Sequence, residues 1–183
     1  MIAARAAILA AGTSSRVGRQ KLLMDFRGRK LIEYPIAAAQ QWNPVVVCGL
    51  EVEAYLREHF EVELVRNEQP ELGMAHSLTL ANRAVSYDHA LIVLLGDKPL
   101  VSRSLIALIL AEAESADFIY PERDGVPGHP VVLSPLARRY IDELPSGDTV
   151  RMLREHPALR VRAVYSQDPG AVFDVDEAAQ FSR

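Results

Sequence analysis

A short stretch near the start of the sequence carries the residue types that can hold a polyphosphate. Residues 9–21 read LAAGTSSRVGRQK and begin at the end of an apolar run, residues 6–9, that predicts a buried first strand of a parallel sheet. A loop with glycines, hydroxyls, two arginines and a lysine can direct several N–H groups and positive charges at one polyanion, such as a triphosphate. Gly18 is followed by Arg19 rather than by Lys and Ser/Thr, and GxGxxG is absent. A Walker A loop and a dinucleotide fold are therefore disfavoured.

Three carboxylates are candidates for a divalent metal site. Asp97 follows Gly96 at the end of another apolar run, where its side chain can reach the edge of a sheet. Asp174 and Asp176 lie in the motif FDVD at residues 173–176, where a period of two places both carboxylates on one side. Because Mg²⁺ prefers one or two carboxylates together with phosphate oxygens, we predict a Mg²⁺ site at Asp97 with Asp174 or Asp176. For Asp176 the alternative is a helix N-cap, since Glu-Ala-Ala follows it.

The elements that must position these residues alternate along the chain. Strands are predicted at residues 6–9, 45–48, 62–65, 91–95, 118–120, 131–133 and 161–164, and helices at residues 31–40, 52–58, 74–85, 104–114, 135–143 and 149–155. Such alternation predicts β-α-β units, whose right-handed crossovers place helices on both faces of a mostly parallel, Rossmann-like sheet. The predicted fold class is α/β, with residues 1–183 as a single domain.

Ligands of such sheets bind at the carboxyl ends of the strands. The loop that holds Gly12 and the pair Gly96-Asp97 both follow predicted strand ends, so we expect them at the same edge although they are far apart in sequence. Residues 121–130, PERDGVPGHP, contain three prolines, two glycines and no periodic run. A functional loop is expected there.

Composition limits the class of protein. Of the 183 residues, 49% are hydrophobic and 24% are charged, as in an average soluble globular protein. The formal net charge of −4 argues against a general nucleic-acid binder, so an anion site must be local. Cys48, the only cysteine, ends a strand-like run and is predicted to be a buried thiol. The first residues do not have the pattern of a signal peptide, and a cytoplasmic protein is expected.

Six motifs follow one another along nearly the whole chain: residues 9–21 (LAAGTSSRVGRQK), 67–78 (NEQPELGMAHSL), 94–99 (LLGDKP), 128–133 (GHPVVL), 147–148 (GD) and 173–181 (FDVDEAAQF). In this order they resemble the motifs of the MobA-like nucleotidyltransferases, which include LAAGxSxRMGxxK, LxGDMP and GHPVLF. The sequence is similar to the branch that transfers CMP to molybdopterin, the molybdenum cofactor cytidylyltransferases. The resemblance implies the nucleotide-diphospho-sugar transferase type of fold.

The resemblance also implies a reaction and the residues that carry it. CTP, with Mg²⁺, would convert the molybdopterin cofactor to its cytosine dinucleotide and release pyrophosphate, a transfer that depends mostly on positioning and charge neutralisation. The expected catalytic residues are Arg16, Lys21 and Asp97. The expected nucleotide-binding residues are Leu9, Ala10, Ala11, Gly12, Thr13, Ser14, Ser15, Arg16, Lys21, Gly73, Ser77 and Gly96. The expected acceptor-binding residues are Gly128, His129, Pro130, Gly147 and Asp148.

The choice of CTP over GTP follows from the resemblance and from one methyl group. The guanylyl branch typically reads LAGG and CDxP, where this chain has LAAG and GDKP. A side chain at Ala11 narrows the space beside the base, which favours a pyrimidine. The alternatives left open are a molybdopterin guanylyltransferase, nucleotidyl transfer to a sugar or polyol phosphate, and a nucleotide-binding regulatory module without activity. A molybdoenzyme or its chaperone is the partner class that the resemblance leaves open, and no nucleic-acid or membrane partner is expected.

The sequence departs from the family motifs in three places. Lys98 stands where the family has Met beside the expected metal ligand, and the sequence leaves open whether it points into solvent or touches a phosphate. The last motif lacks the Thr and Pro that start the family's final helix but keeps both carboxylates. Pro127 stands where an Arg is common before GHP. Nearby candidates for the acceptor phosphate, each with the alternative of an ordinary surface arginine, are Arg123, Arg151 and Arg154.

Overall fold

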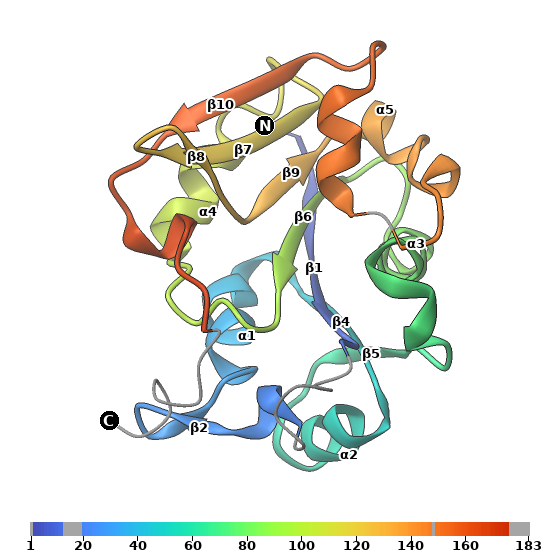
Figure 1. Ribbon diagram of the computed structural model, residues 1–183, viewed down its shortest axis with the longest axis vertical. Helices are drawn as coiled ribbons and strands as arrows, with labels where there is room; N and C mark the ends of the chain where they lie inside the picture. The colour runs from blue at the N-terminus through green and yellow to red at the C-terminus, as the bar shows by residue number, and fades with distance from the viewer. Residues whose placement is uncertain (1, 13–19, 148, 176–183) are drawn as a thin grey trace.

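The computed structural model of the chain describes residues 2–12, 20–147 and 149–175. Its main feature is an eight-stranded sheet with the order β10-β7-β9-β6-β1-β4-β5, in which β8 pairs with β7 (Figure 1). The strands are β1 (Ala4–Ala10), β4 (Val45–Cys48), β5 (Glu63–Arg66), β6 (Ala90–Leu95), β7 (Phe118–Arg123), β8 (Val126–Pro127), β9 (Val131–Leu133) and β10 (Val161–Tyr165). A separate small hairpin consists of β2 (Asp25–Phe26) and β3 (Arg29–Lys30).

Helices connect these strands. The α-helices are α1 (Glu33–Ala39), α2 (Leu50–His59), α3 (Gly73–Ala84), α4 (Arg103–Leu110) and α5 (Pro135–Arg138). Short 3₁₀ helices are η1 (Lys21–Leu23), η2 (Gln40–Trp42), η3 (Pro70–Leu72), η4 (Ile141–Glu143), η5 (Val150–Glu155) and η6 (Pro169–Ala171). Among the described residues, no helix is both long and apolar enough to cross a membrane.

The sheet is mostly parallel, as predicted. β1 pairs in parallel with β4 and β6, β4 with β5, and β7 with β10. Within the row of seven strands, β9 runs antiparallel to both of its neighbours, β6 and β7. The α/β fold class and the predicted Rossmann-like arrangement are confirmed.

Apolar side chains of the strands form two buried layers, one on each face of the sheet. Ile8 belongs to the layer covered by α1, α2 and α4, whereas its neighbour Ala7 belongs to the layer covered by α3, α5 and η5. Figure 1 shows α1 and α4 on one side of the sheet and α3 and α5 on the other. Cys48 is fully buried in the first layer, as predicted, and burial raises the pKa of its thiol to about 12.

Three segments differ from the sequence prediction. The helix predicted at residues 135–143 ends at Arg138 and is followed by η4, and the helix predicted at residues 149–155 is the 3₁₀ helix η5. Over one or two turns, apolar spacing does not separate the two helix types. Residues 121–130 are not one open loop, because β7 continues to Arg123 and turns back into β8 through Asp124 and Gly125. Both turn residues have positive φ, as Asp-Gly hairpin turns require.

A buried arginine joins α5 to the end of α3. Arg138 is 1% exposed, and its guanidinium donates to the backbone carbonyls of Asn82, Val85, Ser86 and His89 at 2.5–2.8 Å. Its Nε also donates to the side-chain oxygen of Asn82 at 2.8 Å. These carbonyls lie in and just after the last turn of α3, where helical partners are missing. Arg138 therefore fixes the far end of the helix whose first turn reaches the candidate site.

Candidate active site

The end of β1 and the turn after β6 meet at one edge of the sheet. Leu9 is in register with Leu95, and the N–H of Gly96 donates to the carbonyl of Leu9 at 2.9 Å. A Cβ at position 96 would lie 3.2 Å from carbon atoms of Ala10, Leu22 and Ile32, so this turn packs tightly against the end of β1. The strand ends that precede Gly12 and Gly96-Asp97 thus lie at the same edge, as predicted, while residues 13–19 of the Gly12 loop lie outside the described part of the chain.

Lys21 and Asp97, two of the residues predicted to act in catalysis, form an ion pair at this edge. Lys21 Nζ lies 3.3 Å from Asp97 Oδ2, and the two side chains are 17% and 34% exposed. Lys21 begins η1, whose N-cap is the side chain of Gln20. A half-buried ammonium beside a carboxylate that reaches solvent is suited to a site for phosphate and a divalent cation.

The next residue along the chain, Lys98, forms a second ion pair. Lys98 Nζ donates to Asp174 Oδ1 at 2.5 Å and to the carbonyl of Phe173 at 3.3 Å. The side chain of Lys98 is only 5% exposed, whereas that of Asp174 is 47% exposed. The sequence left open whether Lys98 points into solvent or touches a phosphate. The first alternative is wrong, because the carboxylate of Asp174 holds the Lys98 ammonium inside the protein.

Two backbone contacts position Asp174 independently of its side chain. A Cβ at Gly128 would lie 2.2 Å from the carbonyl oxygen of Ala171, and His129 N–H donates to this carbonyl at 2.8 Å. A Cβ at Gly170 would lie 2.0 Å from the carbonyl oxygen of Leu100. Only glycine fits at either place, so the segment that carries Asp174 is held close to both the GDKP turn and the GHP motif.

The donor set fits a hard divalent cation. Asp97 and Asp174 offer carboxylate oxygens, the ligands that Mg²⁺ prefers, and bound phosphates commonly complete its coordination. In the described part of the chain there is no group of three or more His, Cys, Asp or Glu side chains that could hold a metal alone. Both carboxylates now neutralise an ammonium, Lys21 or Lys98. Asp97 and Asp174 would hold the ion, with the nucleotide phosphates as further ligands.

Gly73, predicted to bind the nucleotide, and Gly147, predicted to bind the acceptor, lie next to each other. Gly73, the first residue of α3, has φ 82°, and a Cβ there would lie 3.1 Å from the Cα of Gly147. Gly147 N–H donates to the carbonyl of Leu72 at 3.2 Å. Farther along α3, Ser77 is buried, and its hydroxyl accepts from Asn67 Nδ2 at 2.9 Å. Contact of Ser77 with a nucleotide stays a prediction, and Asn67, the first residue of the motif at residues 67–78, holds the hydroxyl of Ser77 in place.

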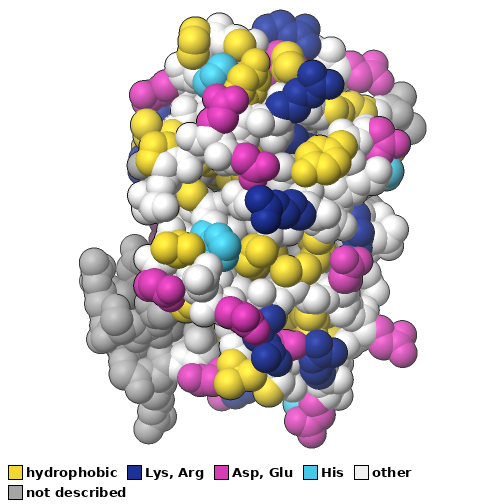
Figure 2. All heavy atoms as spheres, turned by 90° about the vertical axis from the view of Figure 1, so that its right-hand side faces the viewer, with side chains coloured by type: hydrophobic (Ala, Val, Ile, Leu, Met, Phe, Trp, Pro, Cys, Tyr) yellow, Lys and Arg dark blue, Asp and Glu magenta, His cyan; other side chains and the backbone are white. Residues whose placement is uncertain are grey.

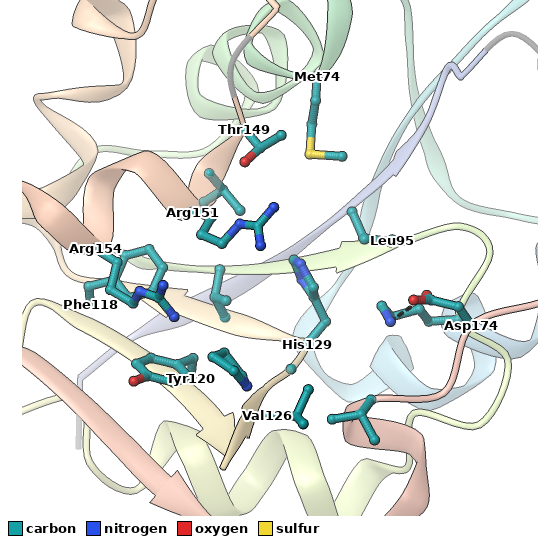
Figure 3. Close-up of a pocket in the computed structure, with 16 residues that line it drawn as sticks. Met74, Leu95, Phe118, Tyr120, Val126, His129, Thr149, Arg151, Arg154 and Asp174 are labelled. Atoms are coloured by element: carbon teal, nitrogen blue, oxygen red, sulfur yellow. Dashed lines mark hydrogen bonds and ion pairs between the residues drawn. The ribbon is translucent and has the colours of Figure 1, made fainter. Parts of the chain in front are cut away.

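A cavity of about 400 Å³ opens between β6, β7, β9 and η5. Arg151 and Arg154 of η5 approach it from one side, with the Arg154 guanidinium 5.4 Å from the centre of the Tyr120 ring. Figure 3 shows Arg151 and His129 pointing into the same space, with the Asp174 ion pair on the opposite wall. Apolar atoms of Met74, Leu95, Phe118, Val126, Val131 and Val150 line the remainder. The cavity can therefore hold an anionic group at one end and a flat, partly apolar body beside it.

Of the predicted acceptor residues, Gly128 and His129 line this cavity, and Pro130 is buried behind them. Arg123 lies on β7 and is paired with Asp124 at 3.5 Å, so it is the one of the three candidate arginines that does not line the cavity. The structure does not describe eight of the residues considered above, which are Thr13, Ser14, Ser15, Arg16, Gly18, Arg19, Asp148 and Asp176.

One polar atom of His129 is unusual. Its Nδ1 is buried and, among the described residues, is the one buried side-chain nitrogen or oxygen without a hydrogen-bond partner. Burial, together with the nearby charge of Lys98, lowers the pKa of the ring to about 4, although Asp174 and a hydrogen bond to the backbone of Val93 act in the opposite direction. The ring is therefore neutral at pH 7, and its Nδ1 can accept a hydrogen bond.

The lowered pKa of His129 predicts a loss of stability on mild acidification. The unfolded chain takes up a proton at this ring near pH 6.5, whereas the folded protein does so only near pH 4. The stabilisation is therefore complete above pH 6.5 and is lost as the pH falls towards 4, by at most about 3 kcal/mol. Urea unfolding at pH 7, 6 and 5 should show a shallower loss in His129→Asn than in the wild type. The same substitution at the exposed His59 is the matched control, and equal slopes for wild type and His129→Asn would contradict the prediction.

The face that carries α3 and α5 shows basic, acidic and apolar side chains interspersed (Figure 2). Positive charge is not gathered into one extended patch on this face. The arginines that line the cavity are therefore a local feature, which agrees with the net charge of −4.

Comparison with known proteins identifies the family. The profile of the MobA-like NTP transferase domain matches residues 6–163. The chain belongs to this family. This MobA-like chain is 25% identical to the molybdenum cofactor cytidylyltransferase of Escherichia coli K12 over 132 residues, which cover 69% of this chain and 68% of that protein. It is 35% identical over 114 residues to the bifunctional protein GlmU of Alkalilimnicola ehrlichii, covering 58% of this chain but only 24% of that protein.

Solved structures agree with the MobA-like fold. The crystal structure of Rv0371c from Mycobacterium tuberculosis H37Rv aligns with a TM-score of 0.84 and 25% identity, covering 99% of this chain and 97% of that one. The Rv0371c complex with manganese aligns with a TM-score of 0.80 and 22% identity, covering 97% and 95% of the two chains. The family predicted from the motifs is confirmed.

Proposed function

We propose that this protein is a Mg²⁺-dependent cytidylyltransferase that joins CMP from CTP to the phosphate of the molybdopterin cofactor and releases pyrophosphate. The observation that carries the proposal is that the two ion pairs share consecutive residues, Asp97 and Lys98, and so join the predicted phosphate site to the cavity. The Lys21–Asp97 pair lies where the predicted phosphate loop leaves β1, and Lys98 and Asp174, next to it, line the arginine-containing cavity. A triphosphate on one side and an anionic acceptor on the other would thus meet at the two ion pairs.

Each group has a role that its chemistry supports. Lys21 would neutralise charge on the triphosphate as a compact cation, together with the backbone N–H groups of the loop. Asp97 and Asp174 would hold Mg²⁺, which when bound supplies charge neutralisation at the reacting phosphates. Arg151 and Arg154 would orient the acceptor phosphate. An acceptor phosphate is already ionised at neutral pH, so the transfer needs no general base.

The shape and lining of the cavity support a pterin-type acceptor. A ring system can lie against Tyr120 and the apolar lining, beside the neutral ring of His129. Similarity to the Escherichia coli molybdenum cofactor cytidylyltransferase supports the same acceptor and CTP as donor. The manganese complex of the structurally similar Rv0371c supports a divalent metal in this fold.

Pyrophosphate release measured with each nucleotide and each acceptor tests the proposal. CTP with the molybdopterin cofactor is expected to give the highest kcat/KM, and the product is expected to be the cytosine dinucleotide. Faster release with GTP would replace cytidylyl by guanylyl transfer. Release with a sugar or polyol phosphate but not with the cofactor would move the enzyme to another acceptor class. Absence of release with every pair, despite nucleotide binding, would favour a regulatory module.

The choice of base has its own test at Ala11. Its side chain is 7% exposed and lies beside the exposed Gly12. If the Ala11 methyl group narrows the base site, Ala11→Gly should reduce the CTP over GTP preference by about 1–2 kcal/mol, the scale on which apolar pockets discriminate single carbon groups. The measurement is kcat/KM for both nucleotides in the wild type and the variant. An unchanged ratio would remove the steric reason for CTP.

A further inference from the structure

The two ion pairs of the site differ in how firmly they hold the carboxylate. Lys21 approaches Asp97 at 3.3 Å from a position that is 17% exposed. Lys98 approaches Asp174 at 2.5 Å, is 5% exposed, and also donates to the carbonyl of Phe173. The second pair is therefore the shorter, and its ammonium is the more deeply buried of the two, while the Asp174 carboxylate still reaches solvent. Burial of one partner strengthens the attraction between opposite charges.

Lys98 has little freedom to leave this position. Its backbone N–H donates to the carbonyl of Leu95 at 3.3 Å, within the tight turn that follows β6. Its side chain forms part of the cavity wall together with His129 and Arg151. An ammonium at this place is close enough to His129 to contribute to lowering the pKa of that ring. The charge of Lys98 is thus directed at the carboxylate of Asp174 from inside the protein.

We propose that Lys98 is an internal counter-cation that competes with the divalent metal for Asp174 and so sets the metal affinity of the site. The proposal rests on the proposed function, which places the metal at Asp97 and Asp174. An ammonium and a divalent ion repel each other, so metal binding at Asp174 must weaken or displace the Lys98 contact. Lys98 is a positioning residue in this scheme and does not touch the reacting atoms.

Removal of the ammonium should leave the carboxylate in place. The segment of Asp174 is fixed by the contacts of Gly128 with Ala171 and of Gly170 with Leu100, neither of which involves Lys98. Methionine is unbranched, apolar and adaptable, and so suits the buried path of the Lys98 side chain. The Lys98→Met protein is therefore expected to keep Asp174 near the metal position but without a competing charge.

The test is titration of the nucleotide-free protein with Mn²⁺, followed by electron paramagnetic resonance of the free ion. Lys98→Met should bind Mn²⁺ at least tenfold more tightly than the wild type. Lys30→Met is the matched control, because Lys30 is paired with Asp25 in the β2-β3 hairpin, and it should leave Mn²⁺ affinity unchanged. A structural role of Lys98 would instead weaken binding when the residue is lost. Unchanged or weaker binding by a folded Lys98→Met protein overturns the proposal.

Two further variants distinguish failure of the Lys98 proposal from failure of the proposed function. Asp97→Asn and Asp174→Asn should each weaken Mn²⁺ binding at least tenfold. If they do so while Lys98→Met fails to tighten it, only the role of Lys98 is overturned. If neither aspartate variant changes binding, or if no variant binds Mn²⁺ even with CTP present, the metal site and the role of Lys98 are both overturned. Should Lys98→Met fail to fold, Lys98→Gln, which keeps a donor for the carbonyl of Phe173, must show the same tightening.

Discussion

Asp97→Asn is expected to remove nearly all activity while leaving the fold intact. The carboxylate lies at the edge of the sheet, is 34% exposed and contacts Lys21 at 3.3 Å, so it contributes little to packing. As a metal ligand it would act on charge that develops in the transition state, where loss of one such interaction costs about 10²–10³-fold in kcat, or ~3–4 kcal/mol. The measurement is kcat at saturating CTP and Mg²⁺.

The stability of the same variant provides the control. A half-exposed ion pair contributes at most about 1 kcal/mol, so the free energy of unfolding should change by no more than that. Asp25→Asn removes an exposed carboxylate from a comparable pair with Lys30, at 3.2 Å, within the separate β2-β3 hairpin. It should keep full activity. Turnover near the wild-type rate in folded Asp97→Asn would exclude Asp97 as a metal ligand.

The sheet could be predicted because its signals are local. Each of the predicted strand runs overlaps a strand of the structure, and the order of strands and helices predicted the parallel arrangement. The hairpins β2-β3 and β7-β8 were not predicted. Each strand of the first has only two residues, and the second joins the end of the longer strand β7 to the two-residue strand β8. Their turns, Arg27-Gly28 and Asp124-Gly125, have positive φ at both residues. Asp-Gly is a known hairpin signal and could have identified the second of them.

The site was predictable only where residues follow strand ends. Leu9 and Leu95 are in register on neighbouring strands, so the loops after them had to meet, and Lys21 and Asp97 are indeed in contact. This inference needs only the parallel topology. The meeting of Gly73 with Gly147 needed the structure, because it depends on how η3 and the loop before η5 approach each other.

The directions of long charged side chains could not be predicted. Lys98 points inward because Asp174, 76 residues later, offers a carboxylate beside it. Arg138 is buried because the carbonyls at the end of α3 lie within its reach, although an arginine on a short helix is normally expected in water. In both cases the partner comes from a distant segment, and no spacing in the sequence records that the two will meet.

Lys21 is expected to be replaceable neither by alanine nor by arginine. Lys21→Ala removes a cation from the triphosphate side and should lower kcat/KM for CTP by about 10²-fold or more. Lys21→Arg retains the charge, but Lys21 is the first residue of η1 and its side chain is only 17% exposed. A planar guanidinium is larger than an ammonium and directs its donors differently, so a loss of at least about tenfold is expected.

Lys30 allows the size effect to be separated from a general effect of arginine. It is paired with Asp25 at 3.2 Å, its side chain is 32% exposed, and it lies in the β2-β3 hairpin, so Lys30→Arg should keep wild-type kinetics. Affinity for CTP measured without acceptor then divides the Lys21 effect into binding and turnover. A greater loss in kcat than in affinity would mean that Lys21 acts on charge that develops during transfer. Full activity of Lys21→Arg would reduce Lys21 to a distant positive charge and would move the main phosphate contact to another residue of the loop.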